Sequence, residues 1–327
     1  MKKYIIVIVM LLLINGGSIA GNADSDHQPV TLTILHLNDT HSTFLSSPFK
    51  VSFPPDSTVY RLAVGSVARI ASVVNSIREE MDNVLFIHAG DLVQGSLFYT
   101  LFGGEADADV YNAMNLEAMC LGNHEFDRGS EGLLVLLEDA EFPIVCANVD
   151  VSSDSLLAGM LPPYVLLEAG GERIGVIGLI VEELANVFSP SAGTVILPVA
   201  ETAQSMIEQL EAEGINKIIL LTHIGYENDL MLASRLTGAD VIVGGHSHTV
   251  LGDLSSLGLS SEGEYPTVVP GVDGEDVLVV QAGSRAVMIG KLSMEFDESG
   301  HIIAYSGAPL IVTGGEILDA DRNPVEG

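Results

Sequence analysis

The feature that most constrains this chain is an apolar run that ends abruptly in polar residues able to do chemistry. Ala118 to Leu121 reads as a buried strand, and Gly-Asn-His-Glu-Phe-Asp follows at residues 122–127. Gly122 has no Cβ, so the backbone can turn sharply there. Open α/β sheets bind ligands at the carboxyl ends of their strands, which favours a functional site over a turn whose Asn and Asp serve only the backbone.

The same pattern recurs at four other places along the chain. Each is an apolar run that ends in Asp, His or both: Thr31–Leu37 before Asp39 and His41, Val84–His88 before Asp91, Lys217–Leu221 before His223, and Ala239–Val243 before His246 and His248. Helical spacing lies between such runs, at Leu62–Met81, Ser130–Ala140 and Glu201–Glu213. The alternation predicts an α/β fold. Within it, Asp39 and His41 can reach one ion together, because residues i and i+2 of an extended chain point the same way.

Other segments carry weaker signals. Residues 44–60 hold three prolines and are predicted to form a surface loop, whereas 142–149 and 173–180 read as strands. Helical spacing disappears after Val277, and the runs 277–281, 290–296 and 301–306 predict antiparallel strands. Two single residues have competing interpretations. His88 lies inside its strand and is predicted to be a packed core histidine, while Asp91 fits either a helix cap or a metal ligand.

Net charge narrows the set of partners. The 327 residues include 13 Lys plus Arg and 44 Asp plus Glu, for a formal net charge of −31. Nucleic-acid backbones and anionic membranes would be repelled by such a surface, so neither is expected as a partner. The two cysteines, Cys120 and Cys146, sit in apolar runs, where a thiol behaves as a small hydrophobe. We expect both to be buried and unbridged, although export would permit a disulfide.

Residues 1–20 have the layout of a secretory signal peptide. Lys2 and Lys3 precede an apolar run at residues 4–14, and small residues at 18–20 offer a cleavage site. The run is much shorter than the roughly 20 residues that cross a bilayer, so an uncleaved anchor is the weaker alternative. We therefore expect a periplasmic or extracellular protein with no stable membrane anchor after cleavage.

The polar residues at the strand ends form a plausible set of metal ligands. They are Asp39, His41, Asp91, Asn123, His223, His246 and His248. Imidazoles with carboxylates suit Zn, Mn, Fe or Co, whereas Mg or Ca would favour oxygen ligands alone. The set is too large for one tetrahedral ion and fits two divalent ions that share a carboxylate, an arrangement suited to in-line displacement at phosphorus. His124 cannot easily bind metal if Asn123 does, because adjacent side chains diverge. It is available to donate a proton, and Asp127 can fix its tautomer.

Five motifs in this order resemble those of calcineurin-like metallophosphoesterases, and in particular those of the secreted bacterial 5′-nucleotidase and 2′,3′-cyclic phosphodiesterase family. They are Asn38-Asp39-x-His41, Gly90-Asp91-x-x-Gln94-Gly95, residues 122–127, Thr222-His223-x-Gly225 and Gly244-Gly245-His246-Ser247-His248. The resemblance covers about residues 31–313 and implies a four-layer α/β sandwich, in the order αββα, with two metals. It implies Asp39, His41, Asp91 and His248 as ligands of one metal, and Asp91, Asn123, His223 and His246 as ligands of the other. His124 and Asp127 match the family's catalytic dyad.

The resemblance also sets the expected domain boundaries. We expect a signal peptide at 1–20, a catalytic domain at 21–313 and, at 314–327, a tail that resembles the start of an interdomain linker. Family members resemble a two-domain clamp whose C-terminal domain reads the nucleotide, and this sequence stops where that domain would begin. The expected substrate is a small phosphate ester, and a nucleotide by resemblance. The alternatives are a non-nucleotide phosphatase or phosphodiesterase, a thiosulfohydrolase-like enzyme, a truncated family member with little nucleotide specificity, and a secreted metal-binding protein without turnover.

Overall fold

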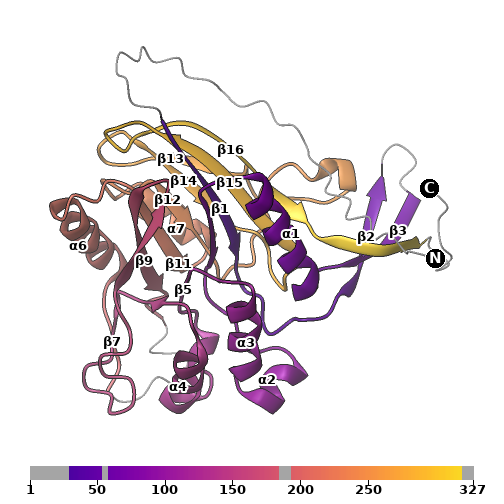
Figure 1. Cartoon of the computed structure of the whole chain (residues 1–327), viewed down its shortest axis with the longest axis horizontal. Coiled ribbons are helices and arrows are strands. Elements are labelled where there is room, and N and C mark those ends of the chain that lie inside the picture. The colour runs from indigo at the N-terminus through magenta and orange to yellow at the C-terminus, as the bar shows by residue number, and fades with distance from the viewer. Residues whose placement is uncertain (1–28, 54–57, 184–192, 319–327) are drawn as a thin grey trace.

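The structure is a computed structural model, and it describes residues 29–53, 58–183 and 193–318 (Figure 1). The expected signal peptide at 1–20 lies outside these residues, as do residues 319–327 of the expected tail. Two six-stranded sheets form the centre of the described structure.

The first sheet has the strand order β16-β15-β1-β4-β5-β6. Its strands are β1 (Val30–Leu37), β4 (Val84–His88), β5 (Ala118–Cys120), β6 (Ile144–Val145), β15 (Met288–Phe296) and β16 (Ile302–Ile311). Strands β1, β4, β5 and β6 run parallel. β15 pairs with β1 in antiparallel orientation, and β16 pairs with β15 in the same way. β1 is buried from Leu32 to Leu37. A strand covered on both faces is expected to be largely apolar along its length, as this one is.

The second sheet has the order β13-β14-β12-β11-β9-β8. Its strands are β8 (Tyr164–Ala169), β9 (Glu172–Ile180), β11 (Ile218–His223), β12 (Val241–Val243), β13 (Thr267–Pro270) and β14 (Asp276–Val280). The four inner strands run parallel, and the two outer strands are antiparallel to their neighbours. Each sheet therefore has four parallel strands whose carboxyl ends can supply ligands.

Helices lie outside the two sheets, which pack against each other. β5 and β6 contact β9, and β5 also contacts β11. The helices are α1 (Val67–Glu80), α2 (Leu97–Phe102), α3 (Glu105–Ala113), α4 (Gly129–Asp139), α6 (Val199–Ala212) and α7 (Tyr226–Ala233), with short 3-10 turns η1 (His124–Phe126) and η2 (Ser255–Leu257). α1 contacts β4, α6 contacts β9, and α7 contacts β13 and β14 (Figure 1). The predicted four-layer α/β sandwich is confirmed.

The segment at residues 44–60 differs from the prediction. It contains β2 (Ser47–Phe53) and the start of β3 (Thr58–Val64), which pair as an antiparallel hairpin, so the predicted loop is wrong. The next helix begins at Val67 instead of Leu62 for the same reason. β17 (Thr313–Leu318) pairs with β3, so regular structure continues past residue 313. This small sheet depends on pairing between segments far apart in sequence, which local proline content does not reveal.

Two further segments fold differently from the prediction. Of the three strands predicted after Val277, β15 and β16 are antiparallel, whereas β14 is parallel to β12 and antiparallel only to β13. The single strand predicted at 142–149 is two short pieces, β6 and β7 (Val149–Asp150), and β7 pairs with β10 (Val195–Ile196).

The core residues behave as expected. Cys120 and Cys146 are buried and unbridged. His88 is fully buried, and its Nε2 lies 3.0 Å from the Thr40 hydroxyl, so it is a core histidine as predicted. Among the described residues, every helix is too short or too polar to cross a bilayer.

Candidate metal centre

The carboxyl ends of five strands meet where the two sheets pack together. In the first sheet, β1 ends before Asp39, β4 before Asp91 and β5 before Asn123. In the second sheet, β11 ends at His223, and β12 ends just before His246 and His248. The junction is closed by His223, whose Nε2 lies 3.1 Å from Asp91 Oδ2 and 3.8 Å from Asp39 Oδ1. The five predicted strand ends are therefore brought into one place, although they span more than two hundred residues of sequence.

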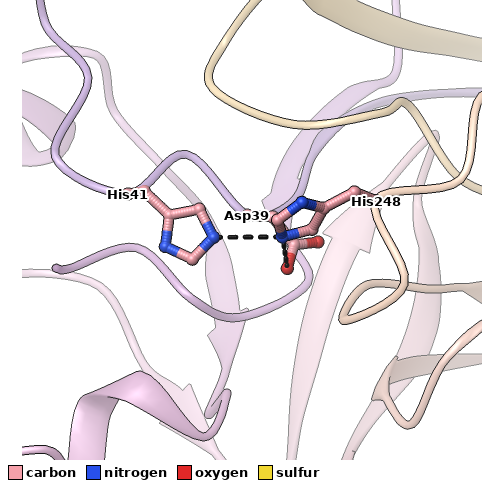
Figure 2. A group of neighbouring side chains, drawn as sticks. All are labelled: Asp39, His41 and His248. Carbon is pink, nitrogen blue, oxygen red and sulfur yellow. Dashed lines mark hydrogen bonds and ion pairs between the residues drawn. The ribbon is translucent and has the colours of Figure 1, made fainter. Parts of the chain in front are cut away.

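One group of potential ligands consists of Asp39, His41 and His248 (Figure 2). His41 Nε2 lies 3.1 Å from His248 Nε2, and that nitrogen of His248 lies 3.2 Å from Asp39 Oδ1. Asp39 and His41 are buried, whereas the His248 side chain is 42% exposed. The three donor atoms thus point at one spot that is open to solvent on the His248 side.

Two further groups continue from the first. Asp91 joins Asp39 and His223 in one and joins His41 and His124 in the other, with donor atoms within 4.8 Å of one another in each. Asp91, Asp39 and His41 each belong to two of the three groups, so the groups overlap and form one continuous set of donors.

Asn123 and His246 complete the predicted set. Asn123 Oδ1 lies 2.8 Å from His246 Nδ1, so these two donors also face each other. His246 is attached to the first sheet as well, because its backbone N–H donates to the carboxylate of Asp39 at 3.0 Å. All seven candidate ligands are therefore in one cluster.

The backbone of this cluster is strained. Five of the seven candidate ligands have positive φ: Asp39 (51°), His41 (51°), Asp91 (54°), His246 (76°) and His248 (57°). A left-handed conformation costs a non-glycine residue about 1–2 kcal/mol. Such strain collects at functional sites, where the surrounding structure fixes the geometry.

Two glycines allow the loops to approach closely. A Cβ on Gly122 would collide with the backbone nitrogen and the carboxylate of Asp91, and a Cβ on Gly245 would collide with the carbonyl of Ala89. Glycine is needed at both positions because the space of a side chain is filled by ligand-bearing loops.

Several residues orient the ligands, and sequence reasoning gave them no role. The Asn38 amide donates to Asp39 Oδ2 (2.7 Å) and to the carbonyl of Gly283 (2.6 Å). His223 Nδ1 donates to the Ala89 carbonyl at 2.7 Å, which leaves Nε2 facing the carboxylates. Glu125 is buried and accepts from backbone N–H groups on both sides of the cluster. Asn38 precedes Asp39, and Glu125 follows Asn123 by two residues, and that position within the motifs is the only sequence signal they offer.

The charges in the cluster are arranged for a cation. Burial by itself lowers the pKa of His223, but Asp91 and Asp39 beside it raise that pKa to about 10. Burial would likewise raise the pKa of Asp91, but His223 holds it well below its usual range. Among the described residues, no Lys or Arg forms an ion pair with Asp39 or Asp91. The two buried carboxylates therefore have imidazoles beside them in place of Lys or Arg, and a divalent ion would neutralise such carboxylates in a metal site.

The donor set fits such an ion. His223 Nε2 is buried and forms no hydrogen bond among the described residues, and it faces Asp91 Oδ2 at 3.1 Å. The carboxylates, imidazoles and amide converge from several sides, which is the ligand chemistry of Zn, Mn, Fe and Co. An ion between His223 and the two carboxylates would take this buried nitrogen as a ligand.

His124 and Asp127 form a pair at the rim. His124 Nδ1 lies 2.9 Å from Asp127 Oδ2, and the two side chains are 27% and 24% exposed. His124 Nε2 faces the cluster, 4.0 Å from Asp91 Oδ2. The pair therefore has one nitrogen fixed by a carboxylate and the other directed at the place where a substrate would meet the ligands.

Comparison with known proteins agrees with this geometry. Residues 32–250 match the family described as calcineurin-like phosphoesterase. The chain belongs to this family. It is 38% identical to a probable 5′-nucleotidase of Treponema pallidum over 314 residues, which is 94% of this chain and 53% of that protein.

Solved structures of family members show the same fold. A 5′-nucleotidase precursor from Thermus thermophilus superposes with a TM-score of 0.83 and 41% identity, over 87% of this chain and 55% of that one. The NAD nucleotidase of Haemophilus influenzae superposes with a TM-score of 0.86 and 35% identity, over 92% and 54%. This calcineurin-like phosphoesterase chain spans about half the length of the relatives it matches.

Proposed function

We propose that this chain hydrolyses phosphate monoesters, including nucleoside 5′-monophosphates, with two divalent cations held at the junction of its two sheets. One observation carries the proposal. Seven potential ligands converge in a partly buried cluster, and the His124–Asp127 pair lies at its rim, directed inward. A protein that only stored metal would have no use for that pair.

By resemblance to the family, the ligands would divide into two sets. Asp39, His41, Asp91 and His248 would hold one ion, and Asp91, Asn123, His223 and His246 the other. A pair of divalent cations supplies Lewis acidity, which activates water and neutralises charge on the phosphoryl group. Their identity lies among Zn, Mn, Co and Fe by donor chemistry.

His124 supplies the proton that the leaving group needs. Asp127 accepts a hydrogen bond from Nδ1–H and so keeps the ring in one orientation, with Nε2 toward the cluster. As a water oxygen bonds to phosphorus and the P–O bond to the ester oxygen breaks, the proton on Nε2 passes to that ester oxygen, and an alcohol leaves instead of an alkoxide. The exposure of both side chains lets an ester reach them from solvent.

The names of the relatives support a nucleotide as the substrate class. Proteins named 5′-nucleotidase from several organisms are 35–38% identical to this chain. We propose AMP as a substrate and a simple ester such as p-nitrophenyl phosphate as another. Export to the periplasm or the exterior, directed by residues 1–20, is part of the same proposal, and N-terminal sequencing of exported protein would test it.

The test is phosphate release by the purified chain loaded with Mn²⁺. His124→Ala should lower kcat for AMP by about 10²–10⁴-fold, because general acid catalysis contributes that much. The loss should be smaller for p-nitrophenyl phosphate, whose leaving group needs little protonation. Metal content should stay unchanged.

A matched control lies elsewhere in the chain. His301 and Asp297 also form a His–Asp pair, with 3.6 Å between Nδ1 and Oδ2, and lie next to the turn between β15 and β16. His301→Ala should leave hydrolysis unchanged. A metal-loaded parent that releases no phosphate from either ester would overturn the proposed function. Equal losses on both esters would show instead that His124 contacts the phosphoryl oxygens.

A further inference from the structure

Arg285 lies beside the candidate metal centre, in the loop between β14 and β15. The backbone N–H of Arg285 donates to the carbonyl of Asp39 at 2.8 Å, and Asp39 is one of the candidate ligands. The loop is anchored at a second point, where Asn38 donates to the Gly283 carbonyl at 2.6 Å. The position of Arg285 is therefore tied to the metal ligands themselves.

The backbone at this position is strained in the same way as the ligands. Arg285 and Ala286 have φ values of 57° and 53°, so two consecutive residues with side chains adopt the left-handed conformation. Glycine would adopt it without steric cost. Backbone strain of this kind is common at binding and catalytic sites, where the surrounding structure fixes the conformation.

The guanidinium lies at the rim of the cluster. Arg285 Nη1 is 3.9 Å from the point where a Cβ on Gly95 would stand, and that point is 3.1 Å from His41 Cβ. The side chain is exposed. In the part of the chain that the structure describes, no group accepts a hydrogen bond from it, whereas Arg69, Arg78 and Arg128 each donate to backbone carbonyls.

A cation at this place would attract a phosphate ester to a chain that is otherwise strongly negative. The net charge of −31 repels anions at long range, and Asp127 adds a carboxylate at the rim. A phosphate ester must nevertheless reach the cluster. The planar guanidinium fork matches two phosphoryl oxygens, and Arg is favoured wherever such bidentate recognition matters.

We propose that Arg285 binds the phosphoryl oxygens of the substrate, and of the phosphate product, that face away from the attacked bond. This rests on the proposed function, since it assigns a binding residue to the same site. Arg285 is a binding residue for the phosphoryl group itself, so its effect is shared by every phosphate monoester and does not depend on a base or a sugar.

The first experiment measures binding without turnover. Inorganic phosphate is titrated into the Mn²⁺-loaded chain by calorimetry, with the parent, Arg285→Ala and Arg285→Lys. Loss of a charge-assisted bidentate contact should weaken phosphate binding roughly tenfold in Arg285→Ala, and Arg285→Lys should fall between it and the parent. Metal content and melting temperature should not change, because the side chain is exposed and contacts no ligand atom.

The second experiment measures kcat/KM for AMP and for p-nitrophenyl phosphate. Both should fall by a similar factor of roughly ten, chiefly through KM. The control is Arg173→Ala, which removes an equal charge from the start of β9, where that arginine reaches the Glu213 carbonyl. It corrects for the general effect of net charge.

The outcomes separate cleanly. Phosphate affinity of Arg285→Ala that equals that of Arg173→Ala would overturn the proposal. A loss confined to AMP would also overturn it, because it would place Arg285 on the nucleoside. Failure of the proposed function would look different: the parent would release no phosphate from either ester, whatever its affinity for inorganic phosphate.

Discussion

Glu125 ties together the two loops that carry Asp91 and Asn123, and its removal should affect both folding and metal binding. Its Oε1 accepts from the N–H groups of Leu92 (2.9 Å) and Val93 (3.3 Å), and its Oε2 accepts from those of Asp91 (3.1 Å) and Gly122 (2.7 Å). The side chain is 2% exposed. We expect Glu125→Gln to destabilise the protein and weaken the metal site.

The magnitude follows from the hydrogen-bond count. A Gln side chain has one oxygen, so in either orientation it loses two of the four bonds and points an NH₂ group at two N–H donors. Each bond to a charged acceptor contributes about 1.5–3 kcal/mol, and removing a buried charge returns part of the sum. We expect a net loss of about 3 kcal/mol in the free energy of unfolding. Burial and nearby Asp91 raise the pKa of Glu125 to about 7, so the measurement belongs at pH 8, where the carboxylate is charged.

Urea denaturation in EDTA measures the folding term, and Mn²⁺ titration of the folded protein measures the binding term. Glu117→Gln is the matched control. Glu117 also accepts a backbone N–H, from Phe86 at 2.6 Å, but it pairs with Arg78 and is 32% exposed. The control should lose much less stability and keep its Mn²⁺ affinity. A loss in Glu125→Gln no larger than in Glu117→Gln, with unchanged Mn²⁺ affinity, would refute this account of Glu125.

Two further predictions concern metal stoichiometry and pH. Asp91→Asn should lower occupancy of both sites, whereas His41→Ala should remove about one of about two ions per chain; elemental analysis checks this, and a parent with one ion or none contradicts it. Asp240 accepts the Ile218 N–H at 2.6 Å, and burial raises the pKa of its carboxyl to about 8 from a usual value of 3.8. The folded state then binds more protons than the unfolded state between those values, so stability falls as pH rises through that window. Asp240→Asn should make the fall shallower in urea titrations run in EDTA from pH 5 to 9, and an unchanged slope would show that Asp240 does not titrate this way.

The sequence predicts the sheet cores well because burial on both faces leaves a strong local signal. The strands at 31–37, 84–88, 173–180 and 217–221 lie within two residues of β1, β4, β9 and β11. A strand can be recognised from a long apolar run bounded by polar residues without knowing which strand becomes its neighbour. The four-layer arrangement, by contrast, was predicted from resemblance to a family and not from the runs themselves.

Segments stabilised by distant partners were not predictable in this way. β3 pairs with β2 on one side and, on the other, with β17, which lies some 250 residues further along the chain. Their half-exposed faces give no continuous apolar run, and the prolines between and within them indicate a loop. The parallel pairing of β14 with β12 is a similar case, because a strand's own sequence does not state the direction of its neighbour.

At the site, the convergence of the candidate ligands was predictable from the sequence, and the contacts that hold them in place were not. Asp39, Asp91 and His223 stand where apolar runs end, which is visible in the sequence. The Ala89 carbonyl that orients His223 has no side-chain signal at all. Arg285 is a lone cation in a turn, and only its proximity to His41 and its bond to Asp39 in the fold distinguish it from other arginines.

The strain and the charge of this centre imply that metal and fold stabilise each other. Five ligands in left-handed conformations and two buried carboxylates without Lys or Arg partners among the described residues are unfavourable by themselves. An ion that binds only the folded state adds stability that grows with the ratio of its concentration to its dissociation constant. A variant that loosens the ligand loops must therefore lose more stability in Mn²⁺ than in EDTA. For Glu125→Gln, a tenfold weaker Mn²⁺ affinity should add about 1.4 kcal/mol to the loss measured without metal. If the two losses are equal, the loops that Glu125 joins do not control how the metal binds.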